Sequence, residues 1–332
     1  MQEIRQLVEN LAPNDEDIMY DINIAITNIQ EYINHVMRNS QQKKAKAAAF
    51  QKLDQTSALW LKDFAQKILP VKFREGQKDY FGKKGMSLHV DVFFVRKEEL
   101  LVKHVYLTVI YRCEQNTSSI ISIADIVLNE FKVDEPDVKK LFTKYDNAGC
   151  YHESMYTLCN QKGFELQRYD FNEPCCGKDQ CDRECASGKC IIRSFVDASN
   201  DLLTADDIYN ALHYGNGLKD AKVGIIEIED VPLTGKKIPN ISIYHSIEFH
   251  KEFMLMWRYY DIGESVKQPY CKMQIKPSAK VLKAFSKTDK KNNGKQKEGK
   301  KREDRQWCSL FSVMKKAVSH HLRQLLKGRL MK

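Results

Sequence analysis

The sequence lacks the features that mark membrane-spanning and secreted proteins. No run of the 332 residues approaches the roughly eighteen consecutive apolar residues that a membrane helix needs. The polar, acidic start MQEIRQLVENLAPNDED has no apolar core of a secretory signal. We therefore expect an intracellular protein with no membrane partner. In such a compartment the ten cysteines are expected to be reduced thiols.

Several catalytic motifs are also absent. The sequence has no Walker loop, dinucleotide-binding fingerprint or Gly-x-Ser-x-Gly elbow, so nucleotide-driven chemistry and acyl transfer have no support. The cysteine-rich stretch CCGKDQCDRECASGKC (175–190) contains no Cys-x-x-Cys pair, which is the short spacing that zinc sites favour. This spacing argues against zinc as a cofactor. A zinc-organised interaction module built on this stretch is kept as a weaker alternative.

The net charge of +9 is concentrated at the C-terminal end. Residues 276–332 hold 18 Lys and Arg against four Asp and Glu, a surplus of 14, whereas the rest of the chain is mildly acidic. We expect a disordered basic linker over 276–306 and a basic amphipathic helix over 307–332. Clustered cations displace counterions from phosphates, so this tail predicts DNA binding and a nuclear location, although a solvated tail that aids solubility is the alternative. The residues expected to contact DNA here are Lys290, Lys291, Lys300, Lys301 and Arg302.

Hydrophobic periodicity predicts an α/β protein. Residues 1–55 are expected to form a helical region, because 16–52 place Ile, Met and Val at spacings of three and four without Gly or Pro. Residues 56–230 form the core, and 231–275 extend it with mixed strands. The core is predicted to be a mixed five-stranded sheet flanked by helices. Its expected strands are 58–64, 86–95, 102–112, 140–146 and 163–171, and its clearest helices are 118–131, 182–200 and 204–215.

Three carboxylates fall at the ends of predicted elements. Asp63 closes the first strand, Asp146 closes the fourth, and Asp182 begins the helix after the fifth. Neighbouring strands and the following helix can bring these three together, which is the arrangement that two Mg²⁺ or Mn²⁺ ions need for phosphoryl transfer.

Each of these carboxylates also has a simpler interpretation. Asp146 with Asn147 and Gly149 is compatible with a tight turn. Asp63 is compatible with an exposed strand end, and Asp182 with an acid at a helix N-terminus. Asp91 in HVDVFFV competes with Asp63 for the role of first carboxylate, but its position between two valines favours an exposed sheet residue.

Four segments carry a resemblance to a known family. DFAQKILPVKFREGQKDYFGKKGMSLHV, KYDNAGCYH, GKDQCDRECASGKCIIRSFVDASNDLLTADDIYNAL and MWRYYDIGES resemble, in this order, the catalytic region of transposase-derived proteins of animal genomes. Those proteins are similar to DDE/D transposases with an RNase H-like fold, and the resemblance runs from about residue 50 to 265.

The resemblance implies a function and a site. It implies an RNase H-like core in which Asp63, Asp146 and Asp182 form the metal-binding triad for DNA strand cleavage and strand transfer, often in a homo-oligomer. Relatives usually have a second glycine where this chain has Asp179. That departure favours the alternative, a catalytically inactive transposon-derived protein that binds DNA or chromatin.

Further DNA contacts are expected near the third carboxylate and near the end of the resemblance. Lys178 and Lys189 flank Asp182 and are candidates to contact a phosphate. Trp257 and Arg258 in FMLMWRYYDIG are candidates to stack on and bind nucleic acid. An aromatic and methionine stripe of this kind belongs more often to a protein core.

Overall fold

Two runs rich in β-branched and aromatic residues form the hairpin that the sequence predicts. In the computed structural model these are β2 (Ser87–Lys97) and β3 (Leu100–Ile110), joined by a turn in which Glu98 has a left-handed φ of 55°. β1 (Ser57–Phe64) pairs antiparallel with the other edge of β2. The structure describes residues 16–65, 67–111, 115–146, 152–173, 179–229, 234–235, 238, 240–270, 273–274 and 276–288. All of these lie within Met1–Lys290, one of the two compact units of the chain.

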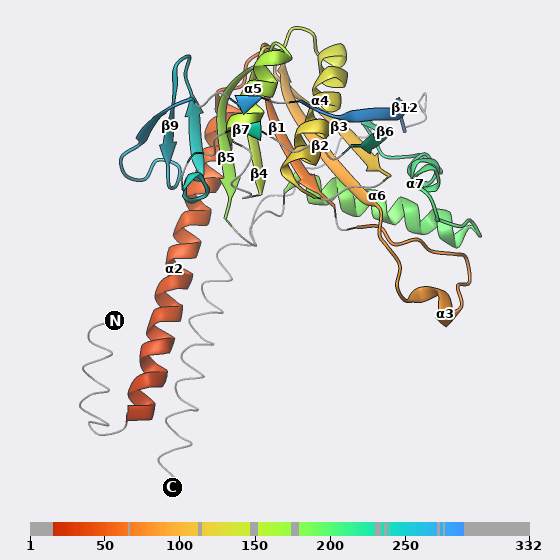
Figure 1. Ribbon diagram of the computed structural model, residues 1–332, viewed down its shortest axis with the longest axis horizontal. Helices are drawn as coiled ribbons and strands as arrows, with labels where there is room; N and C mark the ends of the chain where they lie inside the picture. Colours follow the sequence, from red (N-terminus) through yellow and green to blue (C-terminus); the bar gives the residue numbers. More distant parts are fainter. Residues whose placement is uncertain are drawn as a thin grey trace. The chain divides into compact units, whose positions relative to one another are not determined.

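Two parallel strands continue the sheet beyond β1. β4 (Lys140–Asp146) runs parallel to β1, and β5 (Glu165–Asn172) runs parallel to β4. The centre of the sheet therefore has the order β3-β2-β1-β4-β5, with β2 as the one strand of opposite direction (Figure 1). All five predicted strands are present.

The sheet is twice as wide as the sequence predicted, with ten strands rather than five. Beyond β3 it continues through β6 and β12, and beyond β5 through β8, β9 and β10, so the predicted extension with mixed strands joins the same sheet. A short β7–β11 pair lies apart from it, and a 3-10 turn, η1, precedes β8. The bounds are β6 (Ala221–Ile228), β7 (Thr234–Gly235), η1 (Ile241–Ile243), β8 (Ser246–Phe249), β9 (Phe253–Trp257), β10 (Val266–Pro269), β11 (Met273–Gln274) and β12 (Ala279–Lys287).

β12 corrects the predicted start of the disordered tail. Residues 276–306 were expected to be a disordered linker, but Ala279–Lys287 pair antiparallel with β6. Phe285 lies edge-on to Tyr106 at 5.9 Å between ring centroids and packs over Gly224. The strand was missed because its lysines hide a short apolar pattern. The predicted DNA-contacting residues of the tail, including Lys290, lie outside the described residues.

Helices cover both faces of the sheet (Figure 1). α4 and α5 supply the core on one face, where Trp60, Phe93 and Phe131 stack. α6, α7 and the end of α2 supply the core on the other face, around Leu61, Val90 and Ile208. A short helix, α3, lies in the segment between β1 and β2. The bounds are α2 (Glu16–Gln51), α3 (Gln77–Tyr80), α4 (Thr117–Asp134), α5 (His152–Gln161), α6 (Gln180–Asp197) and α7 (Ala205–Leu212).

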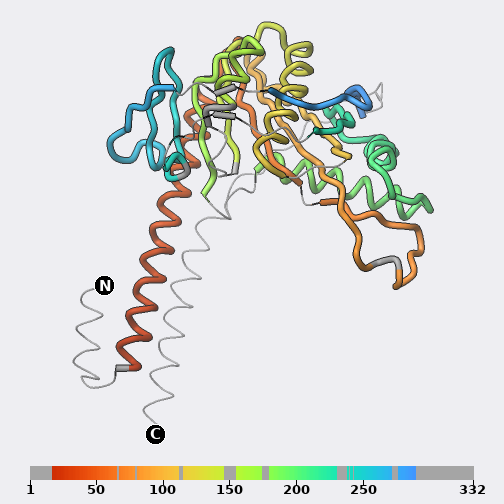
Figure 2. The backbone as a smooth tube through the Cα atoms, viewed as in Figure 1, coloured from red at the N-terminus to blue at the C-terminus, as the bar shows by residue number. Residues whose placement is uncertain are grey.

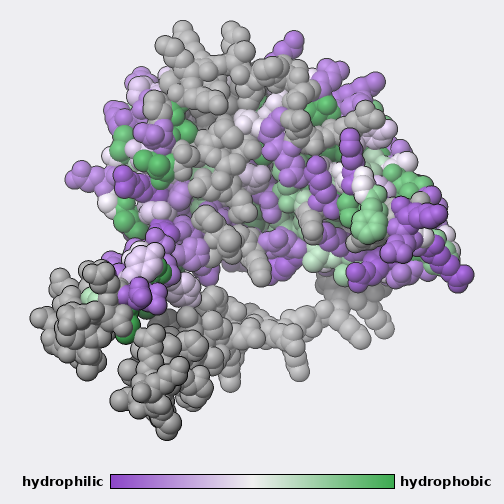
Figure 3. All heavy atoms as spheres, turned by 60° about the horizontal axis from the view of Figure 1, so that its bottom comes forward, coloured by the Kyte–Doolittle hydropathy of each residue, from purple (hydrophilic) through white to green (hydrophobic). Residues whose placement is uncertain are grey.

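Polar side chains cap two of the helices. Thr204 caps α7, because its hydroxyl accepts a hydrogen bond from the Asp207 backbone N–H at 3.2 Å. Asn116 caps α4, since its side chain accepts from Ser119 N at 3.0 Å. α2 is one long helix, and none of the described helices combines the length and apolarity that crossing a membrane requires. On the face shown in Figure 3, hydrophilic residues predominate outside the grey atoms.

Gly217 allows the chain to approach the end of β12 closely. It has a φ of 65°, and a Cβ there would lie 2.1 Å from the carbonyl oxygen of Thr288. Gly215 has the same φ, with open space around its Cβ position. We predict that Gly215→Ala lowers the free energy of unfolding by about 1–2 kcal/mol, the cost of a left-handed alanine. Gly217→Ala should cost about 2 kcal/mol more because Thr288 must move. Urea unfolding of both variants measures the difference, and equal losses would contradict the close approach.

Candidate functional site

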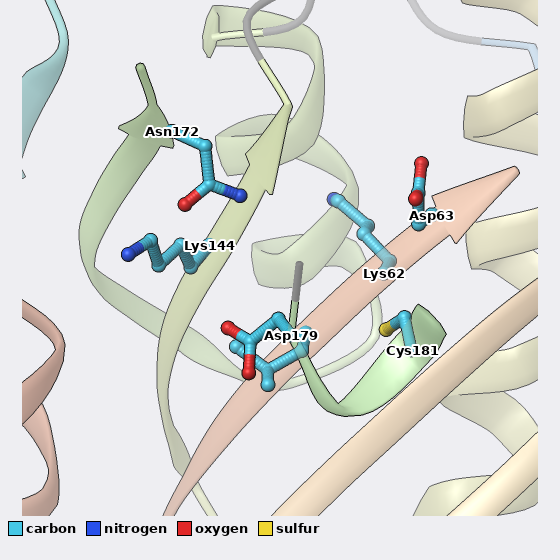
Figure 4. A pocket seen from close by; sticks show the side chains of 7 residues that line it. Lys62, Asp63, Lys144, Asn172, Asp179 and Cys181 are labelled. Atoms are coloured by element: carbon cyan, nitrogen blue, oxygen red, sulfur yellow. The ribbon is translucent and has the colours of Figure 1, made fainter. Parts of the chain in front are cut away.

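A small pocket lies where three parallel strands end and α6 begins (Figure 4). Parallel strands all present their carboxyl ends at the same edge of a sheet, which is where ligands bind in many α/β proteins. The pocket has room for about one water molecule or ion. It is lined by Leu61, Lys62 and Asp63 of β1, Lys144 of β4, Asn172 of β5, and Asp179 and Cys181 at the start of α6.

Two of the predicted carboxylates follow the parallel pairing of β1 with β4. The pairing ends with Leu61 opposite Lys144, and Asp63 and Asp146 each come two residues later, at the same edge of the sheet. The backbone of Asp146 also pairs with Asn172, a residue that lines the pocket. The side chain of Asp146 lies outside the described residues.

Asp182 is exposed in the first turn of α6 and takes part in a capping box. Its Oδ2 accepts a hydrogen bond from the backbone N–H of Asp179 at 3.0 Å. This agrees with the interpretation of Asp182 as a helix N-terminal acid.

Asp182 and Asp63 both affect the pKa of the Cys185 thiol. Burial, together with the negative charges of Asp63 and Asp182, raises the pKa of Cys185 to about 12. Cys185 thus lies under the influence of both carboxylates, one from β1 and one from α6. Two of the three predicted acids are therefore brought into the same region.

Asp179 was not assigned a role from the sequence, yet it lines the pocket directly. It is the N-cap of α6 and accepts from Gln180 N at 2.7 Å, and its carboxylate forms an ion pair with Lys46 of α2. The acid three residues before Asp182 was the available signal, because Asp-x-x-Asp fits a capping box. In Figure 4 the Asp63 carboxylate points away from that of Asp179.

Buried cations fix α2 over the ends of β4 and β5. Lys144 Nζ donates to the Gln42 carbonyl at 3.1 Å, and Arg168 donates to the Ala45 carbonyl at 2.5 Å. Arg168 also donates to Asp170 at 2.9 Å. Burial lowers the pKa of Lys144, against the opposing effect of Asp170. Hydrogen bonds donated by charged groups are stronger than neutral ones, so these contacts stabilise the position of α2 beside the pocket.

Asp91 is buried, not exposed as the sequence suggested. It is 0% exposed, and its carboxylate accepts from Trp60 Nε1 and interacts with His89 Nδ1, each at 2.8 Å. The register puts Asp91 opposite Lys62, whereas Asp63 lies on the alternate face of β1. Asp91 therefore belongs to the core under α4 and α5 and does not compete with Asp63.

Lys62 is a buried cation surrounded by aromatic rings. Its Nζ lies 4.1 Å from the centre of the Trp60 ring and 4.9 Å from that of Tyr169, and it has no hydrogen-bond partner within the described residues. Burial lowers its pKa to about 8, against the opposing charges of Cys159 and Asp91. Sequence patterns do not reveal this buried lysine, since lysine usually marks an exposed strand position.

The remaining candidate residues that the structure describes do not line the pocket. Lys189 and Arg258 are exposed and Trp257 is half-buried at the end of β9, while Lys178 lies outside the described residues. Cys181 and Cys185 share the buried face of α6, and Cys190 is exposed. Within the described part of the chain, no three His, Cys, Asp or Glu side chains are close enough to hold a metal ion. The Asp146 side chain is not part of the described region.

Comparison with known proteins places this site inside a recognised domain. Residues 42–260 match a family described as "Domain of unknown function (DUF8701)", which covers more than half of the 332 residues. The chain belongs to the DUF8701 family. The domain begins where α2 packs over the pocket and ends just after β9, so it contains every residue of the pocket. No curated protein matches the chain.

The buried Lys62 is expected to reduce stability at neutral pH. Its pKa of about 8 lies below its usual 10.5, so the folded protein binds fewer protons than the unfolded chain between these values. The destabilisation is complete below pH 8 and is relieved as the pH rises towards 10.5. We predict that Lys62→Met raises the free energy of unfolding by about 3 kcal/mol at pH 7.

Denaturant unfolding across this pH range measures the difference between wild type and variant. The difference should shrink above pH 8. The exposed Lys139→Met is the matched control and should show no such trend. A constant difference from pH 7 to 10.5 would mean that the Lys62 amine is not perturbed by burial.

Proposed function

We propose that the DUF8701 domain of this protein is an RNase H-like, transposase-like domain that cleaves and joins DNA strands by two-metal-ion phosphoryl transfer. The observation that carries the proposal is the parallel pairing of β1 with β4, which ends with Leu61 opposite Lys144, two residues before Asp63 and Asp146 at the carboxyl ends of these adjacent central strands. A pair of carboxylates on rigid neighbouring strands is what a divalent-ion site requires.

The arrangement of the strands supports the same proposal. The central order β3-β2-β1-β4-β5, with β2 alone reversed, has the order and directions of an RNase H-like sheet. α4 and α5 lie on one face and α6 on the other, so α6 carries Asp182 towards the edge where Asp63 lies. The β6–β12 and β8–β10 strands would be additions to such a core.

The donor groups at this edge suit hard cations. Asp63, Asp146 and Asp182 would hold Mg²⁺ or Mn²⁺, which prefer oxygen ligands. When bound, such ions polarise the phosphate and lower the pKa of the attacking water or DNA 3′-hydroxyl. Cys185 remains a neutral thiol at physiological pH because its pKa is raised to about 12, so it offers no thiolate between the two carboxylates. Lys189, exposed on α6, would contact a phosphate.

A second candidate function is a catalytically inactive, transposon-derived protein that binds DNA or chromatin. Two observations favour it. Asp182 is engaged in the capping box of α6, and Asp179, where relatives usually have glycine, pairs with Lys46. Both functions place the protein on DNA in the nucleus, where the catalytic form would act as a homo-oligomer.

Replacing Asp146 distinguishes the two functions. Asp146→Asn keeps the size of the side chain and its ability to form a turn, but it removes the anionic oxygen that a divalent ion requires. We expect the variant to fold and to bind DNA, and to lose Mg²⁺- or Mn²⁺-dependent nicking of a supercoiled plasmid. Asp137→Asn, at an exposed position between α4 and β4, is the control and should nick normally. Metal-dependent nicking that survives in Asp146→Asn would rule out the role of Asp146 as a ligand.

The basic tail should be tested with two truncations. Residues 289–332 hold 14 Lys and Arg against four Asp and Glu, and their removal leaves β12 intact. We predict that this truncation leaves the melting temperature unchanged and sharply lowers salt-sensitive DNA affinity. Removal of 276–332 also deletes β12, so it should lower the melting temperature as well. Equal affinity and equal salt dependence with and without residues 289–332 would contradict a role of the tail in DNA binding.

A further inference from the structure

The chain leaves the sheet directly after the strand that carries Asp63 and forms an extended loop before returning as β2 (Figure 2). We call residues 67–86 the β1–β2 arm. Backbone hydrogen bonds in both directions between Ile68 and Met86, at 2.9 and 2.8 Å, close its base. A second pair of such bonds, between Val71 and Leu202, ties it to the segment before α7. The backbone of the arm is therefore held in place at two points.

Further hydrogen bonds and an ion pair also limit the freedom of the arm. Phe73 N donates to the Asp201 carboxylate at 2.8 Å. Lys83 Nζ donates to the Pro70 carbonyl at 2.7 Å and forms an ion pair with Glu75. An arm with this many anchors loses little entropy when it binds a partner, so its surface is already arranged for contact.

The exposed charge of the arm is positive. Residues 67–86 contain six Lys and Arg and two Asp and Glu, a surplus of four. Lys67, Arg74, Lys78 and Lys84 are exposed and form no ion pair with the described residues. Four exposed cations on one short segment are suited to a row of phosphates.

Exposed apolar groups lie among these cations. Phe81 is 73% exposed and Phe73 is 36% exposed, and Leu69 is also exposed. The Arg74 guanidinium lies 5.3 Å from the centre of the Phe73 ring. An aromatic ring beside a guanidinium forms a platform on which an unstacked base can lie.

We propose that the β1–β2 arm binds single-stranded DNA, with Phe81 and Phe73 stacking on bases and Lys78, Lys84 and Arg74 contacting phosphates. Bases in a duplex are already stacked and hidden, so an exposed ring contributes only where a strand is open. The choice of DNA over RNA rests on the proposed function. On that function the arm, which follows β1 directly, would hold a separated strand near Asp63.

The test measures the binding of fluorescently labelled oligo(dT), and of an abasic oligonucleotide of the same length, to the full chain by anisotropy. Divalent ions are chelated, so that binding is read independently of cleavage. Phe81→Ala should weaken oligo(dT) binding about tenfold and leave abasic binding unchanged, because only stacking is lost. The double variant Lys78→Gln, Lys84→Gln should bind both oligo(dT) and the abasic oligonucleotide more weakly. It should also lower the slope of log affinity against log salt concentration by about 1.4.

Two matched variants control for general effects. Leu100→Ala removes an apolar group that is also 73% exposed, and Lys219→Gln removes an exposed cation outside the arm. Neither should change binding to either oligonucleotide.

Unchanged oligo(dT) affinity in Phe81→Ala would overturn the proposal, as would an equal loss on duplex DNA. If Phe81→Ala weakens binding to phosphatidylserine vesicles or to oligo(U) more than binding to oligo(dT), the arm binds membranes or RNA instead. Failure of the catalytic proposal has a different signature. In that case nicking is absent or survives Asp146→Asn, while the oligo(dT) result is unaffected.

Discussion

The parallel pairing of β1 with β4 is the constraint on which the candidate site depends. Because Leu61 pairs with Lys144, the last residues of both strands reach the same edge of the sheet. A shift of one residue would turn every side chain of one strand to the opposite face. The apolar residues on both faces of β1 oppose such a shift, since Trp60 packs under α4 and Leu61 packs under α6. The core therefore fixes the register, and the register fixes the positions of the carboxylates.

The same two-sided burial explains which parts of the fold could be predicted. Long strands such as β2 and β3 were found because β-branched and aromatic runs are strong signals. Asp91 and Lys62 were misread or missed because both faces of the sheet are covered, so a polar residue between apolar ones does not mark the solvent side. Short outer strands such as β8 and β10 have four residues each, too few for a period to appear, and β12 carries several lysines.

The site itself was predictable only where position along an element determines geometry. The placement of Asp63 and Asp146 at one edge could be predicted because the ends of parallel strands share an edge. The role of Asp179 depends on Lys46, which is more than a hundred residues away in the chain, and no local pattern reveals that pairing. The capping role of Asp182 was foreseen as an alternative, because an acid in a first turn is a local feature.

The pocket combines acids with buried cations in a way that bears on both candidate functions. Lys144 and Arg168 hold α2 over the strand ends, and the Lys46 ion pair holds α2 to the start of α6. Asp179 therefore helps to fix α6, which also carries Asp182. A glycine at this position would remove the ion pair with Lys46 and the hydrogen bond from Gln180 N, but its backbone N–H could still donate to Asp182. The side chain of Asp179 holds the start of α6 to α2, whereas the contact that engages Asp182 does not depend on the side chain at position 179.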